Sequence, residues 1–302
     1  FGKAPFDNLL ATMGLNYISG VRTTQSYAEA DFSAFGDGRF RDFLPRNQDM
    51  FGQVRKYFDR AQMRQLNAYV GRMGLLLDGL QNQCTTVLYF GIEDVQAKYT
   101  PKHDCEVGAQ AIGCDLATLR LLRAMLDEGR DFLFADAEDL TEIARTGRLG
   151  GEEIRRILLP GLDVIRPEAL TALRQLKKAG VCVLFAEKLP HIDALSGQQL
   201  QLAGEFEAVS VQEAVQIPDA QEPQFKTLSG PIVRQARYRT KDSKSMFFLL
   251  NPGRTESVVR LPGADARRCT ALDPFTGTIT QERLNRDWTV PAVRGIFIII
   301  EE

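Results

Sequence analysis

The clearest candidates for nucleophilic catalysis are a histidine and a cysteine that lie close together in one expected loop. His103 and Cys105 stand two positions apart, and a thiol beside an imidazole is the nucleophile of many hydrolases. Two loop residues so close in sequence rarely reach the required geometry, so a solvated loop histidine is the favoured interpretation. The other histidine, His191, follows Pro190 at an expected turn and has no obvious partner.

A second kind of chemistry needs only two carboxylates. Glycosidic bonds are hydrolysed by a pair of Asp or Glu side chains about 5 to 9 Å apart. Glu29, Asp31 and Asp37 lie in the long irregular segment 22–50, and in (β/α) barrels such loops carry active-site residues. Sequence spacing does not report the distance between carboxylates, so solvated charges are favoured for all three. Aromatic residues, which stack on sugar rings but are more often buried, crowd positions 17–43: Tyr17, Tyr27, Phe32, Phe35, Phe40 and Phe43.

The composition argues against several other classes of function. The 302 residues carry a net charge of −2 without a long basic run, so we expect neither a nucleic-acid partner nor a membrane partner. No apolar run approaches the roughly 18 to 20 residues that span a bilayer. Five cysteines without a CxxC pair and two histidines argue against a metal site, and no cofactor is expected. Cys105 and Cys114 could pair, but free thiols are favoured, and free thiols favour the cytoplasm.

The elements that would position these residues alternate between strand and helix in the middle of the chain. The clearest βαβ unit runs from the strand Ile157–Leu159 through the helix Pro167–Ala179 to the strand Val181–Phe185, since buried parallel strands form unbroken apolar runs. The turn Pro160–Asp163 has no Gly-rich phosphate loop and no Ser or Cys nucleophile, so this domain is predicted to carry no chemistry. Similar patterns predict strands Thr85–Phe90, Asp131–Phe134 and Ala208–Val211 and helices Gln53–Leu80, Asp115–Glu128 and Glu138–Thr146. Such alternation predicts a doubly wound parallel sheet of the flavodoxin-like kind.

The two ends of the chain have different patterns. The segment Phe1–Met13 predicts a helix that leads into a short strand, Gly14–Val21. After an expected linker at residues 217–229, short apolar runs alternate with turn residues, which is typical of a β-sandwich. The expected strands are Val233–Tyr238, Met246–Leu250, Glu256–Leu261, Cys269–Leu272, Thr278–Gln281 and Ile296–Ile300.

The chain contains, in order, the motifs Gly14-Leu15-Asn16, Tyr69 to Leu77, Val87 to Val95, Arg148-Leu149 before Ile157 to Pro160, Phe247 to Asn251 and Asp273 to Gly277. In this order the motifs resemble the C-terminal half of large bacterial glycoside hydrolases, particularly the α-L-rhamnosidase-like proteins. The middle domain is similar to the trimerisation domain that follows the barrel in a β-galactosidase family, which in turn is similar in fold to class I glutamine amidotransferases. Pro160-Gly161 replaces the amidotransferase nucleophile turn, so that activity is not implied, and Ile18-Ser19-Gly20 stands where such barrels often have a histidine.

The resemblance implies a division into domains and a role in carbohydrate metabolism. Residues 1–80 would be the end of a (β/α) barrel and its closing helix, residues 81–216 a flavodoxin-like, amidotransferase-like domain, and residues 230–302 a small β-sandwich. We expect the chain to be a fragment whose catalytic carboxylates lie on earlier barrel strands, so that it hydrolyses no glycoside by itself. Asn16, Arg22 and Tyr27 are predicted to line a wall of the carbohydrate pocket.

Two alternatives remain open. The chain could be a non-catalytic module that forms a homo-oligomer or binds carbohydrate. It could also be a degenerate amidotransferase-like protein that binds a small molecule at the strand ends near Pro160. A barrel with acidic strand ends before Phe1 would favour the glycoside hydrolase, and a ligand near Pro160 would favour the third hypothesis.

Overall fold

A computed structural model describes residues 6–18, 60–99, 109–216 and 224–301. The chain divides into two compact units. The first, called the sandwich unit below, comprises residues 1–80, 224–233 and 241–302, and the second, called the parallel-sheet unit, comprises residues 81–223 and 234–240. The described helices of residues 6–18 and 60–77 belong to the same unit as the C-terminal strands. The division into domains at residues 1–80, 81–216 and 230–302 stays a prediction.

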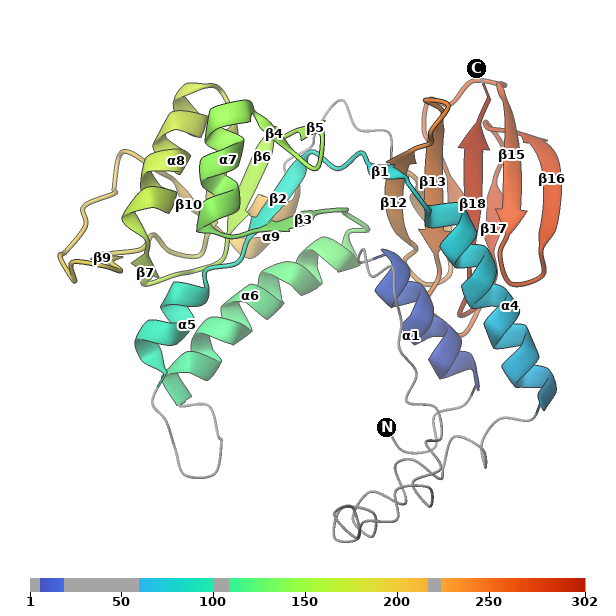
Figure 1. Cartoon of the computed structure of the whole chain (residues 1–302), viewed down its shortest axis with the longest axis horizontal. Helices are drawn as coiled ribbons and strands as arrows, with labels where there is room; N and C mark the ends of the chain where they lie inside the picture. The colour runs from blue at the N-terminus through green and yellow to red at the C-terminus, as the bar shows by residue number, and fades with distance from the viewer. Residues whose placement is uncertain (1–5, 19–59, 100–108, 217–223, 302) are drawn as a thin grey trace, which may run out of the picture. The chain divides into compact units, whose positions relative to one another are not determined.

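The parallel-sheet unit contains a five-stranded sheet in the order β10-β8-β6-β2-β3, and all neighbouring strands are parallel. In chain order these strands are the fifth, fourth, third, first and second, as Figure 1 shows for the labelled strands. The doubly wound parallel sheet predicted from the buried apolar runs is therefore present. Its strands are β2 (Thr86–Tyr89), β3 (Leu133–Ala135), β6 (Arg156–Leu159), β8 (Cys182–Ala186) and β10 (Ala208–Val209).

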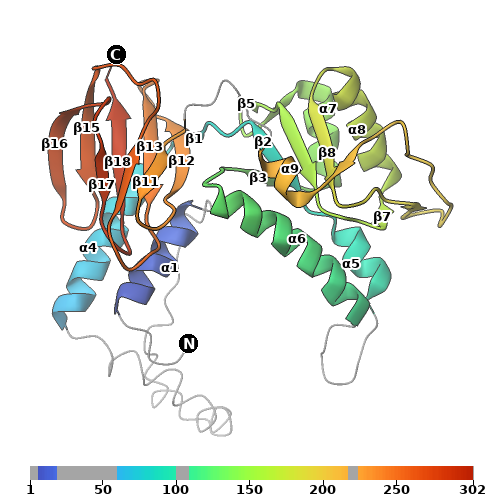
Figure 2. The same cartoon turned by 180° about the vertical axis from the view of Figure 1, so that it is seen from behind.

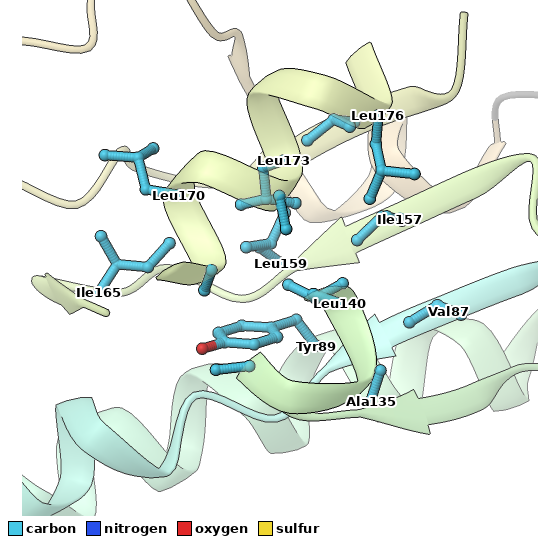
Figure 3. Close-up of a cluster of buried hydrophobic side chains, with 14 of the residues drawn as sticks. Val87, Tyr89, Ala135, Leu140, Ile157, Leu159, Ile165, Leu170, Leu173 and Leu176 are labelled. Carbon is cyan, nitrogen blue, oxygen red and sulfur yellow. The ribbon is translucent and has the colours of Figure 1, made fainter. Parts of the chain in front are cut away.

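Helices cover both faces of this sheet (Figures 1 and 2). Successive side chains of a strand point to opposite faces, and the two cores follow this rule: Val87 and Tyr89 pack with α7 and α8, whereas Leu88 packs with α6 and α9. Figure 3 shows the first core, where Leu140 and Leu173 lie over the strands. The helices are α6 (Ala109–Asp127), α7 (Ala137–Thr146), α8 (Pro167–Lys178) and α9 (Val211–Gln216).

The local sequence explains where two of these helices begin and end. Asp136 caps α7 by accepting hydrogen bonds from two backbone N–H groups of the first turn, and Asp139 completes a capping box. The same helix ends at Gly147, whose φ of 73° is left-handed and favours glycine. Helix α8 begins with Pro167, which lacks the N–H that a first turn leaves unsatisfied.

Further strand pairs complete the parallel-sheet unit: β1 with β12 and β4 with β5 are antiparallel, and β7 with β9 is parallel. The resemblance implies that Arg148-Leu149 is the second strand of the parallel sheet, and this is wrong, because these residues form β4, which pairs with β5 in a separate hairpin. A short helix, α5 (Ile92–Lys98), follows β2. The remaining strands are β1 (Gln81–Asn82), β4 (Arg148–Leu149), β5 (Glu152–Glu153), β7 (Val164–Ile165), β9 (Ile192–Asp193) and β12 (Arg234–Arg239).

The sandwich unit is built from antiparallel strands, as predicted. Strands β13, β18, β15 and β16 are consecutive neighbours in one sheet, and β11, β14 and β17 form another. Phe247 and Ile298 of the first sheet share a core with Val259 and Trp288 of the second, which is the packing of a β-sandwich. The strands are β11 (Lys226–Ser229), β13 (Ser245–Leu250), β14 (Ser257–Arg260), β15 (Arg268–Asp273), β16 (Thr278–Arg283), β17 (Trp288–Val290) and β18 (Gly295–Ile300).

The predicted strand Gly14–Val21 is wrong for its described part, because α1 (Phe6–Ile18) is a helix throughout. Leu10 and Tyr17 are buried on one stripe of this helix, which is the helical rather than the strand period. A Cβ atom at Gly14 would lie 2.6 Å from a methyl carbon of Leu250, so this glycine serves close packing. Helix α4 (Arg60–Leu77) confirms the predicted helix over its described residues, and residues 6–18 and 60–80 contain no barrel strand.

Two strands of the sandwich unit were not predicted. Strand β11 lies inside the expected linker 217–229. It was missed because its sequence Lys-Thr-Leu-Ser is largely exposed and lacks an apolar run. Strand β17 has only three residues and follows a polar segment. No helix among the described residues is long and apolar enough to cross a membrane.

Candidate functional site

The carboxyl edge of the parallel sheet is where ligands bind in open α/β folds, at the point where the strand order reverses. Here the chain leaves β2 through α6 to β3 on one side, and it returns through α7 to β6 on the other side of β2. The segments that meet at this point are Phe90–Gly91 with α5, and Pro160–Asp163. The turn after β8, at Glu187 and Lys188, lies beside the second of these segments.

A fully buried carboxylate joins the two segments. Asp94, in the first turn of α5, has no exposed surface. One of its oxygens accepts hydrogen bonds from the backbone N–H groups of Asp163 and Val164, both at 2.9 Å, and the other accepts from Lys98 Nζ at 3.1 Å. Asp94 therefore uses its charge to hold the β6–β7 connection against α5.

Asp163 is the centre of a network of charged side chains. Its carboxylate forms close ion pairs with Lys98 and Lys188, and His191 Nδ1 lies 3.7 Å from its Oδ1. Burial raises the pKa of Asp163, but the hydrogen bonds and charges of Lys188 and Lys98 lower it more, so the pKa lies below the ordinary carboxyl value. Asp163 therefore stays ionised at neutral pH and acts as an anchor rather than as an acid.

A second buried carboxylate lies on the α7 and α8 side of the same edge. Glu93 accepts a hydrogen bond from the Tyr89 hydroxyl and another from the backbone N–H of Arg166 at 3.4 Å. Burial, followed by the charge of Glu93 and its hydrogen bond, raises the pKa of Tyr89 well above its ordinary value. The tyrosine therefore remains a neutral donor, and this pair also serves the structure.

The turns at this edge leave little room between strands. A Cβ atom at Gly91 would lie 2.9 Å from Leu162, and one at Gly161 would lie 3.1 Å from the carbonyl oxygen of Ala186. Glu187 has a φ of 72°, an uncommon conformation for a residue with a side chain, and its carboxylate pairs with Arg120 at 2.7 Å. The protein's own side chains thus occupy the edge.

The charged side chains at this edge pair with one another. The expectation that His191 has no partner is corrected, because it faces Asp163. At 3.7 Å the two side chains are too far apart for a hydrogen bond, and no Ser, Thr or Cys lies in the described turns Phe90–Gly91, Pro160–Asp163 and Glu187–Lys188. The described residues also contain no group of three or more His, Cys, Asp or Glu side chains that could hold a metal ion.

The predicted pocket residues are not brought together in the described part of the chain. Asn16 lies on helix α1 of the sandwich unit and is half-buried. Arg22 and Tyr27 lie outside the described residues, as do His103, Cys105 and the carboxylates at positions 29, 31 and 37. The assignment of Asn16, Arg22 and Tyr27 to a carbohydrate pocket stays a prediction.

Sequence reasoning missed the charged network at the carboxyl edge. Lys98 and Lys188 lie 65 and 25 positions from Asp163, so no local motif contains all three. One signal was available: Glu93 and Asp94 follow directly after an apolar strand, where parallel strands bring their ends together. That signal would have placed both carboxylates at this edge.

Solved structures with a similar fold are β-galactosidases. The chain is similar to the β-galactosidase from Bacillus circulans sp. alkalophilus, with a TM-score of 0.52 and 11% identity over 80% of this chain and 45% of that chain. It is also similar to Gan42B, a GH42 β-galactosidase, with a TM-score of 0.55 and 10% identity over 82% of this chain and 45% of that chain, and to a catalytic mutant of Gan42B from G. stearothermophilus, with a TM-score of 0.54 and 10% identity over the same shares.

The chain therefore has a fold that occurs in glycoside hydrolases, and it spans less than half the length of these neighbours. At this level of identity, the likeness concerns the fold alone. No protein-family model matches the sequence, and no curated protein matches it.

Proposed function

We propose that this chain is the C-terminal part of a glycoside hydrolase and that it is not catalytic by itself. The observation that carries the proposal is the structural likeness to β-galactosidases, which extends over 80% to 82% of this chain but only 45% of theirs. In this proposal the catalytic carboxylates lie outside the chain, and the described units support the catalytic domain. Asn16, Arg22 and Tyr27 would contribute to the carbohydrate pocket.

The parallel-sheet unit is proposed to be a flavodoxin-like domain related to class I amidotransferases, without their activity. Its strand order agrees with the flavodoxin-like order. The ion pairs of Asp163 with Lys98 and Lys188 occupy the edge where such folds bind ligands. This occupation favours a supporting role over the alternative of a small-molecule site near Pro160.

Hydrolysis assays test this proposal directly. The purified chain is incubated with an aryl β-galactoside and an aryl α-L-rhamnoside, because the resemblance and the structural neighbours point to different sugars. We expect no release of the aryl group above the buffer rate, whereas a full-length β-galactosidase gives rapid release in the same assay. Turnover by the purified chain, retained after further purification, would show that it carries its own catalytic groups.

A second candidate function, assembly into a homo-oligomer, is favoured by an exposed aromatic cluster. Phe90 and Phe134 are 43% and 51% exposed, and the ring of Phe134 meets the rings of Phe90 and Phe132 at centroid distances of 6.4 and 5.4 Å. Phe132 and Phe134 lie at or beside β3, the edge strand of the described sheet. Exposed aromatic groups at an unpaired edge are typical of interaction surfaces.

Light scattering coupled to size-exclusion chromatography tests this second candidate. The wild-type chain should show a molar mass above that of one chain at high concentration, and Phe134→Ser should lower that mass. Leu195→Ser is the matched control, because Leu195 is 75% exposed in the same unit and does not belong to the cluster. A monomeric wild type at all concentrations, or equal effects of both substitutions, would contradict an interface at this cluster.

A further inference from the structure

The parallel-sheet unit contains a second charged feature, a polar cleft of about 550 Å³. Residues next to the amino-terminal ends of β2 and β6, the hairpin of β4 and β5, and strand β12 surround it. Its volume lies within the range of small-molecule sites, about 300 to 1,000 Å³. The charged side chains that line it are Arg148, Arg155, Arg237, Arg239, Glu152 and Glu153.

Positive charge dominates the lining, because four arginines face two glutamates. Arg239 lies 3.6 Å from Glu152 and Arg155 lies 3.7 Å from Glu153, which is too far for hydrogen bonds. The glutamates therefore reduce the positive charge of the lining, but four guanidinium groups outnumber two carboxylates. An anion in the cleft would gain from this excess of positive charge.

The cleft also holds arginine side chains in place. Arg237 donates one hydrogen bond to the backbone oxygen of Gln83 at 3.2 Å, and Arg148 donates one to the backbone oxygen of Gly151 at 2.8 Å. With its side-chain oxygen turned toward Arg239, Gln83 accepts from two guanidinium nitrogens at 3.1 Å. A guanidinium group has five N–H donors in a planar fork, so an anchored arginine can still bind an oxyanion.

We propose that this cleft binds a small hydroxylated acid, namely a sugar acid or a sugar phosphate. The arginines supply donors that match a carboxylate or phosphate, and Glu152 and Glu153 supply acceptors for hydroxyl groups. Inorganic phosphate offers the two carboxylates fewer hydroxyl groups than a sugar does. The lining therefore favours a ligand that carries an oxyanion and hydroxyl groups together, and this inference does not depend on the proposed function.

Isothermal titration calorimetry on the full chain tests the proposal with four probes: galacturonate, galactose 6-phosphate, galactose and inorganic phosphate. We expect at least one of the two charged sugars to bind at least about tenfold more tightly than galactose and inorganic phosphate. Binding of galacturonate alone identifies a carboxylate site, and binding of galactose 6-phosphate alone identifies a phosphate site. No binding of either charged sugar at millimolar concentration, or equal binding of inorganic phosphate, would overturn the proposal.

Variants assign the binding to the cleft. Arg237→Met should weaken the charged sugar about tenfold or more, and Arg148→Met, at an exposed position of the hairpin, carries the same test if the first variant does not fold. Arg145→Met is the matched control, because Arg145 is exposed on α7 and does not line the cleft. Equal affinities for the cleft variants and the control would place the binding elsewhere and overturn the proposal.

A carboxylate variant tests the hydroxyl part of the proposal separately. Glu152→Gln removes a charged acceptor from the cleft, so it should weaken the charged sugar while leaving inorganic phosphate unchanged or tighter. The ratio of the affinity for the charged sugar to the affinity for inorganic phosphate should therefore fall. An unchanged or increased ratio would show that the carboxylates do not recognise hydroxyl groups.

Discussion

Arg72 on α4 is predicted to be a main source of stability in the sandwich unit. Its Nε donates a hydrogen bond to the backbone oxygen of Pro274, and one terminal nitrogen donates to that of Phe275, both at 2.6 Å. The turn that offers these oxygens is itself fixed, since Asp273 accepts from the N–H of Phe275 at 2.8 Å and Gly277 has a left-handed φ of 80°. Replacing Arg72 therefore removes a bidentate contact between a helix and a rigid turn.

The expected loss follows from the number and charge of these bonds. A hydrogen bond from a charged donor contributes about 1.5 to 3 kcal/mol, and two bonds from one half-buried group do not add fully. Arg72→Met should lower the free energy of unfolding by about 2 to 4 kcal/mol. Arg72→Lys supplies one point charge that cannot serve both oxygens, so it should lose about 1 to 2 kcal/mol.

Tryptophan fluorescence during urea denaturation measures this loss in the correct unit. Trp288 is the chain's one tryptophan, and it lies in the core of the sandwich unit. Arg64→Met is the control, because Arg64 is exposed on the same helix. If Arg72→Met unfolds within about 0.5 kcal/mol of the wild type, as surface substitutions do, the turn does not depend on this contact and the reasoning is refuted.

Three further predictions concern the two units. Asp94→Asn should destabilise the parallel-sheet unit by about 1.5 to 3 kcal/mol. Urea denaturation followed by circular dichroism should show this loss, whereas the transition followed by tryptophan fluorescence should be unchanged. A loss of stability seen equally by both signals would contradict the prediction. The pKa of Asp163 is lowered in the folded chain, so its ionised form stabilises the fold above the ordinary carboxyl pKa. This stability is lost as the pH falls through the pKa of the folded state. Asp163→Asn should therefore flatten the pH dependence of stability below about pH 4. Gly71→Ala, at an exposed helical site with open space, should stabilise the sandwich unit by about 0.5 to 1 kcal/mol. Gly14→Ala should not stabilise it, because the new Cβ would lie 2.6 Å from Leu250. Equal gains of stability in urea denaturation would refute close packing at Gly14.

The sequence was sufficient to predict the parallel sheet because each of its main strands is buried on both faces. Strand β6 and strand β8 are runs of apolar residues that end in turns, and α8 between them has a buried stripe that includes Leu173 and Leu176. The strands of the sandwich unit were found from alternation and turn residues, except where a strand was short or exposed. At these strands and helices the local sequence pattern agrees with the burial in the folded chain, so the elements could be predicted.

Prediction failed where long-range packing decides the outcome. Gly14 looks like the start of a strand, yet it lies in a helix, where its small size lets the backbone approach Leu250. The charged network was not predicted for a related reason, since Lys98 and Lys188 meet Asp163 only in the folded sheet. A local sequence pattern therefore predicts neither the contact of Gly14 with Leu250 nor the ion pairs of Asp163.

At the carboxyl edge of the sheet, a carboxylate of the chain itself pairs with backbone N–H groups that follow a strand end. In many α/β proteins, backbone N–H groups at a strand end point toward a bound anion. Here the N–H groups of Asp163 and Val164 point toward Asp94 of the same chain. Lys98 and Lys188 then compensate the charges of Asp94 and Asp163, as they would compensate a ligand. The anion at this edge is a side chain of the same polypeptide, so we expect loss of Asp94 to reduce stability.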